Sequence, residues 1–152
     1  MVIIMRIIID ADACPVTSIA IEIAKKKGIP VTCICDTSHI LDSSYAEIRI
    51  VDKGKDFADL AVVNLCSQGD IVITQDYGVA SMALAKMAKC INQNGLYFTE
   101  SNIDSLMEIR HIAAMERKKC SKNHLKGPKK RTAEDNEKFI LAFTRLIDGV
   151  NS

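Results

Sequence analysis

Three apolar runs in this chain each lead into an aspartate, and this pattern constrains the fold more than any other feature. The runs and their aspartates are 3–9 with Asp10, 48–51 with Asp52, and 71–73 with Asp76. The first is rich in isoleucine and is interrupted only by Arg6. Apolar runs without polar alternation are typical of strands buried on both faces of a parallel sheet. The sequence therefore predicts buried parallel strands that end in carboxylates.

Segments whose apolar residues recur at helical spacing lie between these runs. Helices are expected after Pro15 until Gly28, over 56–67 and over 77–89, and further β-type segments at 31–35, 46–51, 90–91 and 96–98. Strands that alternate with helices imply an α/β fold with right-handed crossovers and a mostly parallel central sheet. We expect three layers, with helices on both faces of that sheet.

The last third of the chain predicts two helices joined by a loop. Ser101 and Asp104 cap a helix that runs towards Lys119, and Thr132 caps a final helix over about 133–148 with an apolar stripe for docking. Residues 120–131 contain Gly127-Pro128 and few apolar side chains, which predicts a mobile basic loop. We expect residues 1–152 to form a single domain.

Composition excludes several classes of protein. Hydrophobic residues make up 48% and charged residues 26%, which is typical of a globular domain and not of a disordered chain. No apolar run reaches the length of roughly 18 residues needed to span a bilayer, and the start lacks the features of a secretory signal. We therefore expect a cytoplasmic protein with no membrane segment. In that compartment the six cysteines should be free thiols.

The aspartates predict a metal site. The carboxyl ends of parallel strands meet at one sheet edge, and Asp56 and Asp59 open the helix that begins at the same edge. Crowded carboxylates repel one another unless a cation compensates them, and hard oxygen ligands suit Mg²⁺ or Mn²⁺. The expected metal ligands are Asp10, Asp12, Asp56, Asp59 and Asp76. The alternative is that Asp12, Asp56 and Asp76 only cap helices.

The distribution of charge predicts contact with a polyanion. Segment 110–131 carries nine Lys or Arg and one acidic residue, a net charge of +8, so the rest of the chain carries −7 within a total of +1. RNA is the expected partner, although a solvated basic stretch is an equally simple interpretation. The expected contacts with substrate are Lys53, Lys55, Thr74, Lys129, Lys130 and Arg131. Lys53 and Lys55 are equally suited to balancing nearby carboxylates.

Two further residues are candidates for chemistry. Cys14 precedes a predicted helix, which favours a reactive thiolate, but neighbouring Asp10 and Asp12 oppose it. A packed, unreactive cysteine is the alternative. His39 lies in a polar loop expected at the same sheet edge as Asp10, where proton transfer is conceivable.

The chain resembles the YaiI/YqxD family of uncharacterised bacterial proteins over nearly its whole length. The likeness rests on Met5–Val16, Val51–Asp59 and Gly69–Asp76, with further agreement at Asn94-Gly95, Arg110 and Gly127-Pro128-Lys129. That family is similar in fold to PIN and NYN nuclease domains, which bind metal through an acidic cluster. The resemblance implies that Asp10 and Asp76 are metal ligands and that Asp59 or Asp56 supplies the helix carboxylate. The Asp12-Ala13-Cys14-Pro15 element departs from typical PIN domains.

These features favour a metal-dependent nuclease or phosphodiesterase acting on RNA. Asp10, Asp59 and Asp76 would position one or two Mg²⁺ or Mn²⁺ ions. A small-molecule phosphatase is one alternative, because Asp10-Ala11-Asp12 resembles the nucleophile motif of haloacid dehalogenase-like enzymes, although Cys14-Pro15 replaces their usual turn. The other alternative is a non-catalytic RNA-binding or regulatory module that uses the basic segment.

Overall fold

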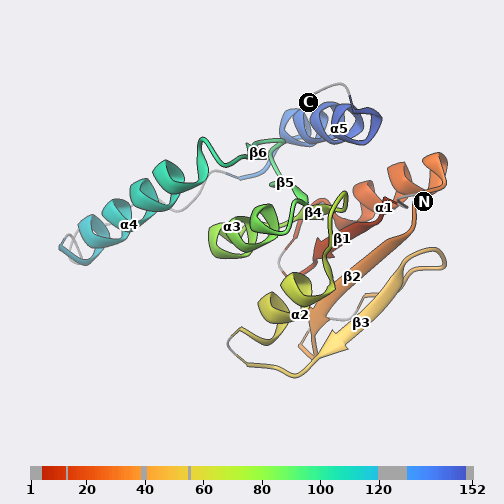
Figure 1. Ribbon diagram of the computed structural model, residues 1–152, viewed down its shortest axis with the longest axis horizontal. Helices are drawn as coiled ribbons and strands as arrows, with labels where there is room; N and C mark the ends of the chain where they lie inside the picture. The colour runs from red at the N-terminus through yellow and green to blue at the C-terminus, as the bar shows by residue number, and fades with distance from the viewer. Residues whose placement is uncertain (1–4, 13, 39–40, 55, 120–129, 150–152) are drawn as a thin grey trace.

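A six-stranded sheet forms the centre of the protein (Figure 1). The structure is a computed structural model that describes residues 5–12, 14–38, 41–54, 56–119 and 130–149. The strands are β1 (Ile7–Asp10), β2 (Val31–Asp36), β3 (Glu47–Val51), β4 (Ile71–Ile73), β5 (Lys89–Ile91) and β6 (Tyr97–Phe98). Their order across the sheet is β3-β2-β1-β4-β5-β6. Only β6 is antiparallel to its neighbour, so the prediction of a mostly parallel sheet is confirmed.

Helices cover both faces of the sheet. The helices are α1 (Thr17–Lys27), α2 (Phe57–Leu65), α3 (Tyr77–Ala85), α4 (Ile103–Lys119) and α5 (Ala133–Asp148). Ile7 and Ile9 of β1 pack in the core with α1 and α5, whereas Ile8 packs in the core with α2 and α3. All three isoleucines are fully buried. The unbroken apolar run of β1 thus reflects a strand that faces a helical layer on each side.

The strand order creates a crevice at one end of the sheet. β1 lies at the centre, and the chain forms β2 and β3 on one side of it before crossing to β4 and β5 on the other. Side chains beyond the carboxyl ends of β1 and β4 therefore border the place where the chain reverses its direction of winding. Open α/β sheets bind ligands at such a place.

The end of α3 and the start of α4 differ from the sequence prediction, and α2 ends at Leu65, two residues earlier than expected. α3 ends at Ala85 instead of residue 89, because Met87 adopts a left-handed conformation with φ of 67° and β5 starts at Lys89. α4 begins at Ile103. The expected cap Ser101 instead shares a hydrogen bond with the Thr99 hydroxyl, and the Asn102 side chain accepts one from the Thr99 backbone.

The final helix docks on the body as predicted. The Thr132 and Asp135 side chains form reciprocal hydrogen bonds with each other's backbone, which is a capping box. Phe139 and Phe143 are fully buried against the α1 face of the sheet. At the turn before β6, Gly95 has φ of +85° and lies so close to α5 that a Cβ atom would be 2.8 Å from the Lys138 carbonyl oxygen. Only glycine fits this contact.

The structure describes only part of the basic segment 110–131, and the mobile loop expected over 120–131 remains a prediction. Residues 120–129 lie outside the described residues, and Arg117, Lys118 and Lys119 form the last turn of α4. The Arg131 guanidinium donates to Asn136 Oδ1, Asn94 Oδ1 and the Gln93 carbonyl oxygen, at 2.6–2.8 Å. Arg131 thus joins the start of α5 to the turn between β5 and β6. Arg131 therefore has a structural role, and its expected contact with substrate remains a prediction.

Two further findings concern the cysteines and the helices. The five described cysteines are free thiols, and Cys33 and Cys35 both pack in the core beneath α1 and α5; Cys120 lies outside the described residues. Within the described ranges, no helix is long and apolar enough to cross a membrane.

Replacing Arg131 tests its structural role. We expect Arg131→Ala to lower the free energy of unfolding by about 2 kcal/mol, because three hydrogen bonds from one cation are lost. Lys130→Ala is the matched control, since Lys130 is exposed, and should change stability by less than about 0.5 kcal/mol. Urea denaturation of both variants measures this. Equal stability of the two variants would contradict the structural role.

Candidate metal centre

Four aspartates line one pocket at the carboxyl ends of the strands. The pocket has a volume of about 240 Å³ and is lined by Asp10, Asp12, Ala58, Asp59, Gln75, Asp76 and Arg110. These residues come from the end of β1, the first turn of α2, the β4–α3 junction and α4. The predicted gathering of Asp10, Asp12, Asp59 and Asp76 is therefore seen in the structure. Asp56 does not line the pocket.

Thr74 ties two of these aspartates together. Its hydroxyl donates to Asp10 Oδ2 at 2.9 Å and accepts a hydrogen bond from the Asp76 backbone at 3.0 Å. Thr74 is only 1% exposed, so it is placed to position Asp10 and Asp76 and not to contact a substrate. The hydrogen bond orients the Asp10 carboxylate at the end of its strand.

Helix capping was the alternative role for Asp12, Asp56 and Asp76. The structure shows a capping hydrogen bond to the side chain of Asp76, but not to those of Asp12 and Asp56. Asp76 Oδ1 accepts from the Val79 backbone at 3.0 Å and so caps α3. Asp56 is the N-cap residue of α2 but makes no capping hydrogen bond with its side chain. Asp12 does not cap α1, because the N-cap residue there is Val16; instead Asp12 Oδ1 accepts from the Asp36 backbone, at the end of β2.

Burial and mutual repulsion make ionisation at this site unfavourable. The pKa of Asp10 rises from 3.8 to about 6, first because the group is buried, and further because Asp59, Asp12 and Asp76 are negatively charged. The hydrogen bond from Thr74 opposes this rise. The pKa of Asp59 is also raised, first by burial and then by Asp76, Asp56 and Asp12. A bound cation would remove this repulsion.

The side chains of the pocket offer the type of ligand atom that a hard divalent cation prefers. All four acidic side chains offer carboxylate oxygens, the ligands that Mg²⁺ and Mn²⁺ prefer. Among the described residues, however, no three Asp, Glu, His or Cys side chains converge closely enough to hold one ion. Mg²⁺ commonly binds through one or two carboxylates and keeps several waters. The arrangement therefore suits a hydrated ion better than an all-protein cage.

Arg110 also lines the pocket, a position that was not predicted from the sequence. Its guanidinium lies 5.4 Å from the centroid of the Tyr77 ring, in a cation–π contact that fixes it beside the acids. The sequence feature that could have revealed the position of Arg110 is its helical spacing from apolar residues. Arg110 follows Ile103 and Leu106 by seven and four residues, so it lies on the helix face that packs on the body.

The other predicted contacts lie away from this pocket or outside the described residues. Lys53 is exposed and does not line it, and Lys130 and Arg131 border a separate cavity beside Gln93. Lys55, Lys129 and His39 lie outside the described residues. Their proposed roles remain predictions.

Cys14 borders a neighbouring cavity of about 400 Å³ that shares Gln75 with the acidic pocket. Burial raises the pKa of the Cys14 thiol, and Asp10 raises it further. The hydrogen bonds from Thr17 and the Val16 backbone and the charge of Arg131 oppose this rise without reversing it. A protonated thiol is a poor nucleophile, so the environment favours the packed cysteine over the reactive one.

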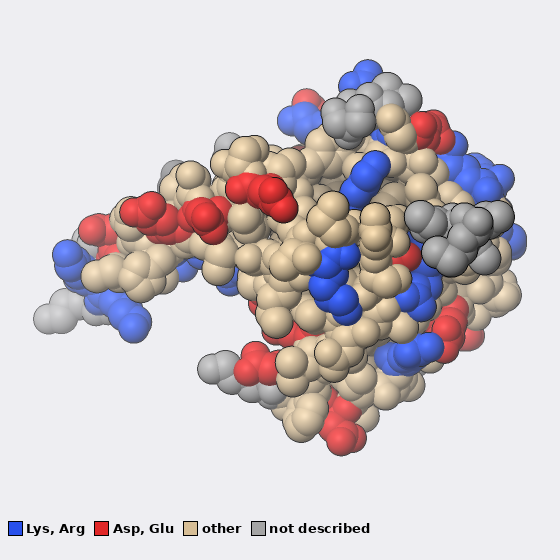
Figure 2. Space-filling model, viewed as in Figure 1, with Lys and Arg blue, Asp and Glu red and all other residues tan. Residues whose placement is uncertain are grey.

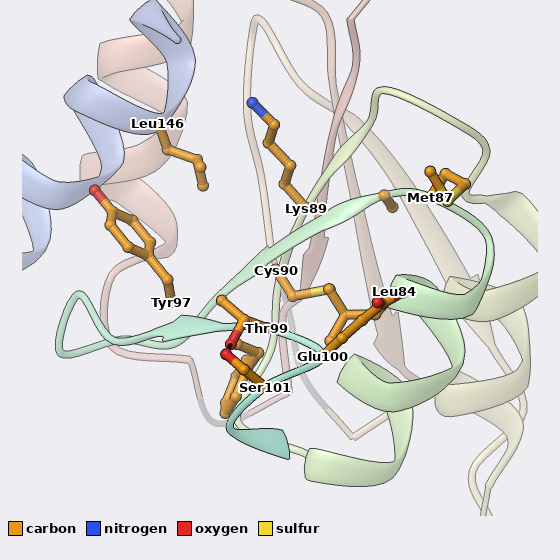
Figure 3. Close-up of a pocket in the computed structure, with 11 residues that line it drawn as sticks. Leu84, Met87, Lys89, Cys90, Tyr97, Thr99, Glu100, Ser101 and Leu146 are labelled. Atoms are coloured by element: carbon orange, nitrogen blue, oxygen red, sulfur yellow. Dashed lines mark hydrogen bonds between the residues drawn. The ribbon is translucent and has the colours of Figure 1, made fainter. Parts of the chain in front are cut away.

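Another cavity, of about 570 Å³, lies beside β5 and the edge strand β6, where β5 begins (Figure 3). Its walls come from the end of α3, the first residues of β5, the segment after β6, and Leu146 of α5. Leu84, Met87, Cys90 and Tyr97 give it a largely apolar lining, and Glu100 is its one carboxylate among the described lining residues. It does not share the chemistry of the acidic pocket.

Comparison with known proteins identifies the family. A family model described as "Uncharacterized BCR, YaiI/YqxD family" matches residues 8–149. The chain belongs to the YaiI/YqxD family. A UPF0178 protein of Clostridium acetobutylicum is 54% identical over 143 residues, covering 94% of this chain and 97% of the relative. A UPF0178 protein of Alkaliphilus oremlandii is 50% identical over 144 residues, covering 95% and 92%.

The family extends to a UPF0178 protein of Bacillus cereus that is 43% identical over 146 residues, covering 94% of this chain and 99% of the relative. No solved structure matches the chain. The family name assigns no activity, and the expected likeness to PIN and NYN domains is not confirmed by any structural neighbour.

The raised pKa of Asp10 predicts that Asp10→Asn stabilises the protein at neutral pH. A folded-state pKa above the unfolded value means that ionisation of this group costs stability, an effect absent below about pH 3.8 and complete above about pH 6. Asparagine cannot ionise and still accepts the Thr74 hydrogen bond. We expect a gain of about 1–3 kcal/mol at pH 7.5 that disappears near pH 3.5.

Denaturant unfolding at both pH values measures this difference. Asp52→Asn is the control, because Asp52 is an exposed acid near the same sheet edge that does not line the pocket. A destabilised Asp10→Asn protein at pH 7.5 would contradict the electrostatic account.

Proposed function

We propose that this protein is a metal-dependent phosphodiesterase that hydrolyses RNA. The observation that carries the proposal is the pocket in which four aspartates from separate elements gather beside one arginine. Clustered carboxylates with a nearby cation suit phosphoryl chemistry, because they combine a metal site with a group that binds the phosphate.

Each residue has a distinct task in this proposal. One or two of Asp10, Asp59 and Asp76 would bind a hydrated Mg²⁺ or Mn²⁺ directly and the others through its water molecules, with Asp12 at the border of the site. When bound, the ion supplies an activated water and offsets charge on the scissile phosphate. Thr74 orients Asp10, and Asp10 must be ionised to serve as a ligand. Metal affinity should therefore increase as the pH rises through about 6, the pKa of Asp10 in the metal-free site.

Arg110 is the substrate-binding residue of the pocket. Its contact with Tyr77 restrains the guanidinium, whose planar donors suit bidentate binding of a phosphate. The arginine also balances part of the negative charge of the four aspartates, which otherwise repels a phosphodiester. Tyr77 is occupied by Arg110 and by an edge contact with Phe98, so it is poorly placed to stack on a base.

RNA is supported by charge and by the resemblance to PIN and NYN domains. The acidic pocket lies between α2 and α4, and α4 ends in the basic residues Arg117, Lys118 and Lys119. Figure 2 shows the molecule hollowed between the projecting α4 and the body. Basic side chains along such a hollow contact the phosphate backbone and read no base identity. We therefore expect cleavage with little sequence preference.

Cleavage of a labelled single-stranded RNA with Mg²⁺ or Mn²⁺, compared with excess chelator, tests the proposal. We expect cleavage that depends on the metal and falls by about 100-fold or more in Asp10→Asn. Asp52→Asn should retain parental activity. Binding of RNA without cleavage in any metal would support the non-catalytic alternative, and cleavage of small phosphate monoesters alone would support the phosphatase.

Arg110 gives a separate prediction. Arg110→Lys should keep the positive charge but lose the planar donors, and we expect a loss of about tenfold in kcat/KM for RNA. Lys26→Ala, at an exposed site on α1 that does not line the pocket, is the control and should change the rate less than threefold. Steady-state kinetics at constant salt measure both. Equal rates for Arg110→Lys and the parent would remove Arg110 from the site.

A further inference from the structure

Helix α4 projects from the body of the protein for much of its length (Figure 1). Of its described residues only Ile103 is buried, and the element that it chiefly packs against is α3. A single helix of this length is only marginally stable in water, because most helical stability in proteins comes from packing of an apolar face. The outer half of α4 lacks such packing within the described residues.

The outer side of α4 is nevertheless apolar. Ile109 is 63% exposed, Ile112 51% and Met115 48%. At about 100° per residue, Ile112 lies on the side of the helix opposite to Ile103, with Ile109 and Met115 flanking it. Adjacent apolar side chains that face solvent commonly mark an interaction surface.

Charges along α4 are separated by sign. The helix starts with Asp104 and Glu108 and ends with Arg117, Lys118 and Lys119, although Glu116 adjoins the basic end. Figure 2 shows acidic side chains along α4 and basic side chains at its far end. Two such helices side by side in parallel would place like charges together. In an antiparallel pair the acidic start of one helix faces the basic end of the other.

We propose that two copies of this chain associate through α4, as an antiparallel pair centred between Ala113 and Ala114. A two-fold axis at that point places Ile112 of one copy beside Met115 of the other, with Ile109 at the flank of the contact. Glu108 of each copy then lies towards Lys119 of the second copy. The helix ends at Lys119, the last described residue before the gap, so the register uses only described residues.

The pairing leaves the acidic pocket open. Arg110 lies two residues before Ile112, on the side of the helix that contacts Tyr77. Packing on the outer face therefore restrains α4, and with it Arg110, without covering Asp10. Few apolar side chains contribute from each copy compared with the roughly 20–30 residues per partner of a standard interface. We expect a weak dimer with a Kd in the micromolar range.

Sedimentation equilibrium over a wide range of protein concentration tests the proposal. We expect a monomer–dimer equilibrium that weakens by about tenfold or more in Ile112→Asp, because the substitution places a carboxylate against Met115 in the apolar centre of the contact, once from each copy. Leu141→Asp is the matched control, since Leu141 is 56% exposed on α5, and should dimerise like the parent. A parent that stays monomeric at millimolar concentration, or a dimer unaffected by Ile112→Asp, would overturn the proposal.

Charge exchange tests the antiparallel register. Glu108→Lys and Lys119→Glu should each weaken the dimer, because each places like charges together, and the double variant should restore the parental Kd within about threefold. Circular dichroism verifies that each variant is folded. A double variant as weak as the single variants would overturn the antiparallel pairing.

Discussion

Burial of the aspartates at the carboxyl ends of β1 and β4, together with their mutual repulsion, is the constraint on which the site depends. An ionised Asp10 with a pKa near 6 costs the fold on the order of 3 kcal/mol at neutral pH. Ile7, Ile8 and Ile9, immediately before it, are fully buried and each contributes roughly 2–3 kcal/mol. The buried strand thus offsets the cost of holding a carboxylate at its end. The Thr74 hydroxyl forms hydrogen bonds with the Asp10 carboxylate and with the Asp76 backbone, and so holds these two residues close to each other.

The main architecture could be predicted because its signals are local. The apolar run through Ile9 and the spacing of small and branched residues after Pro15 each predict one element, and parallel winding follows from their alternation. The gathering of Asp10, Asp59 and Asp76 could also be predicted, because the carboxyl ends of parallel strands meet at one edge of the sheet. The early end of α3 could not be predicted, because the left-handed Met87 reflects the return of the chain into β5.

Contacts between distant segments account for what the sequence did not reveal. A count of basic residues cannot separate Arg110, which reaches back to Tyr77, from Arg131, whose hydrogen bonds join segments 38 residues apart. Both belong to one basic segment, yet one lines the acidic pocket and the other anchors α5. Asp12 likewise resembled a helix cap, but it accepts a hydrogen bond from the end of β2. Burial of Cys14 decided between two opposing local effects on its thiol.

The central claim is that the four clustered aspartates form a site for a divalent cation. A crystal soaked in Mn²⁺ tests it directly, since manganese is located by its anomalous scattering. The account predicts an anomalous peak in the pocket, within coordination distance of Asp10 or Asp76 and with water completing the shell. Mn²⁺ bound elsewhere on the protein, with no peak among Asp10, Asp12, Asp59 and Asp76, would contradict it.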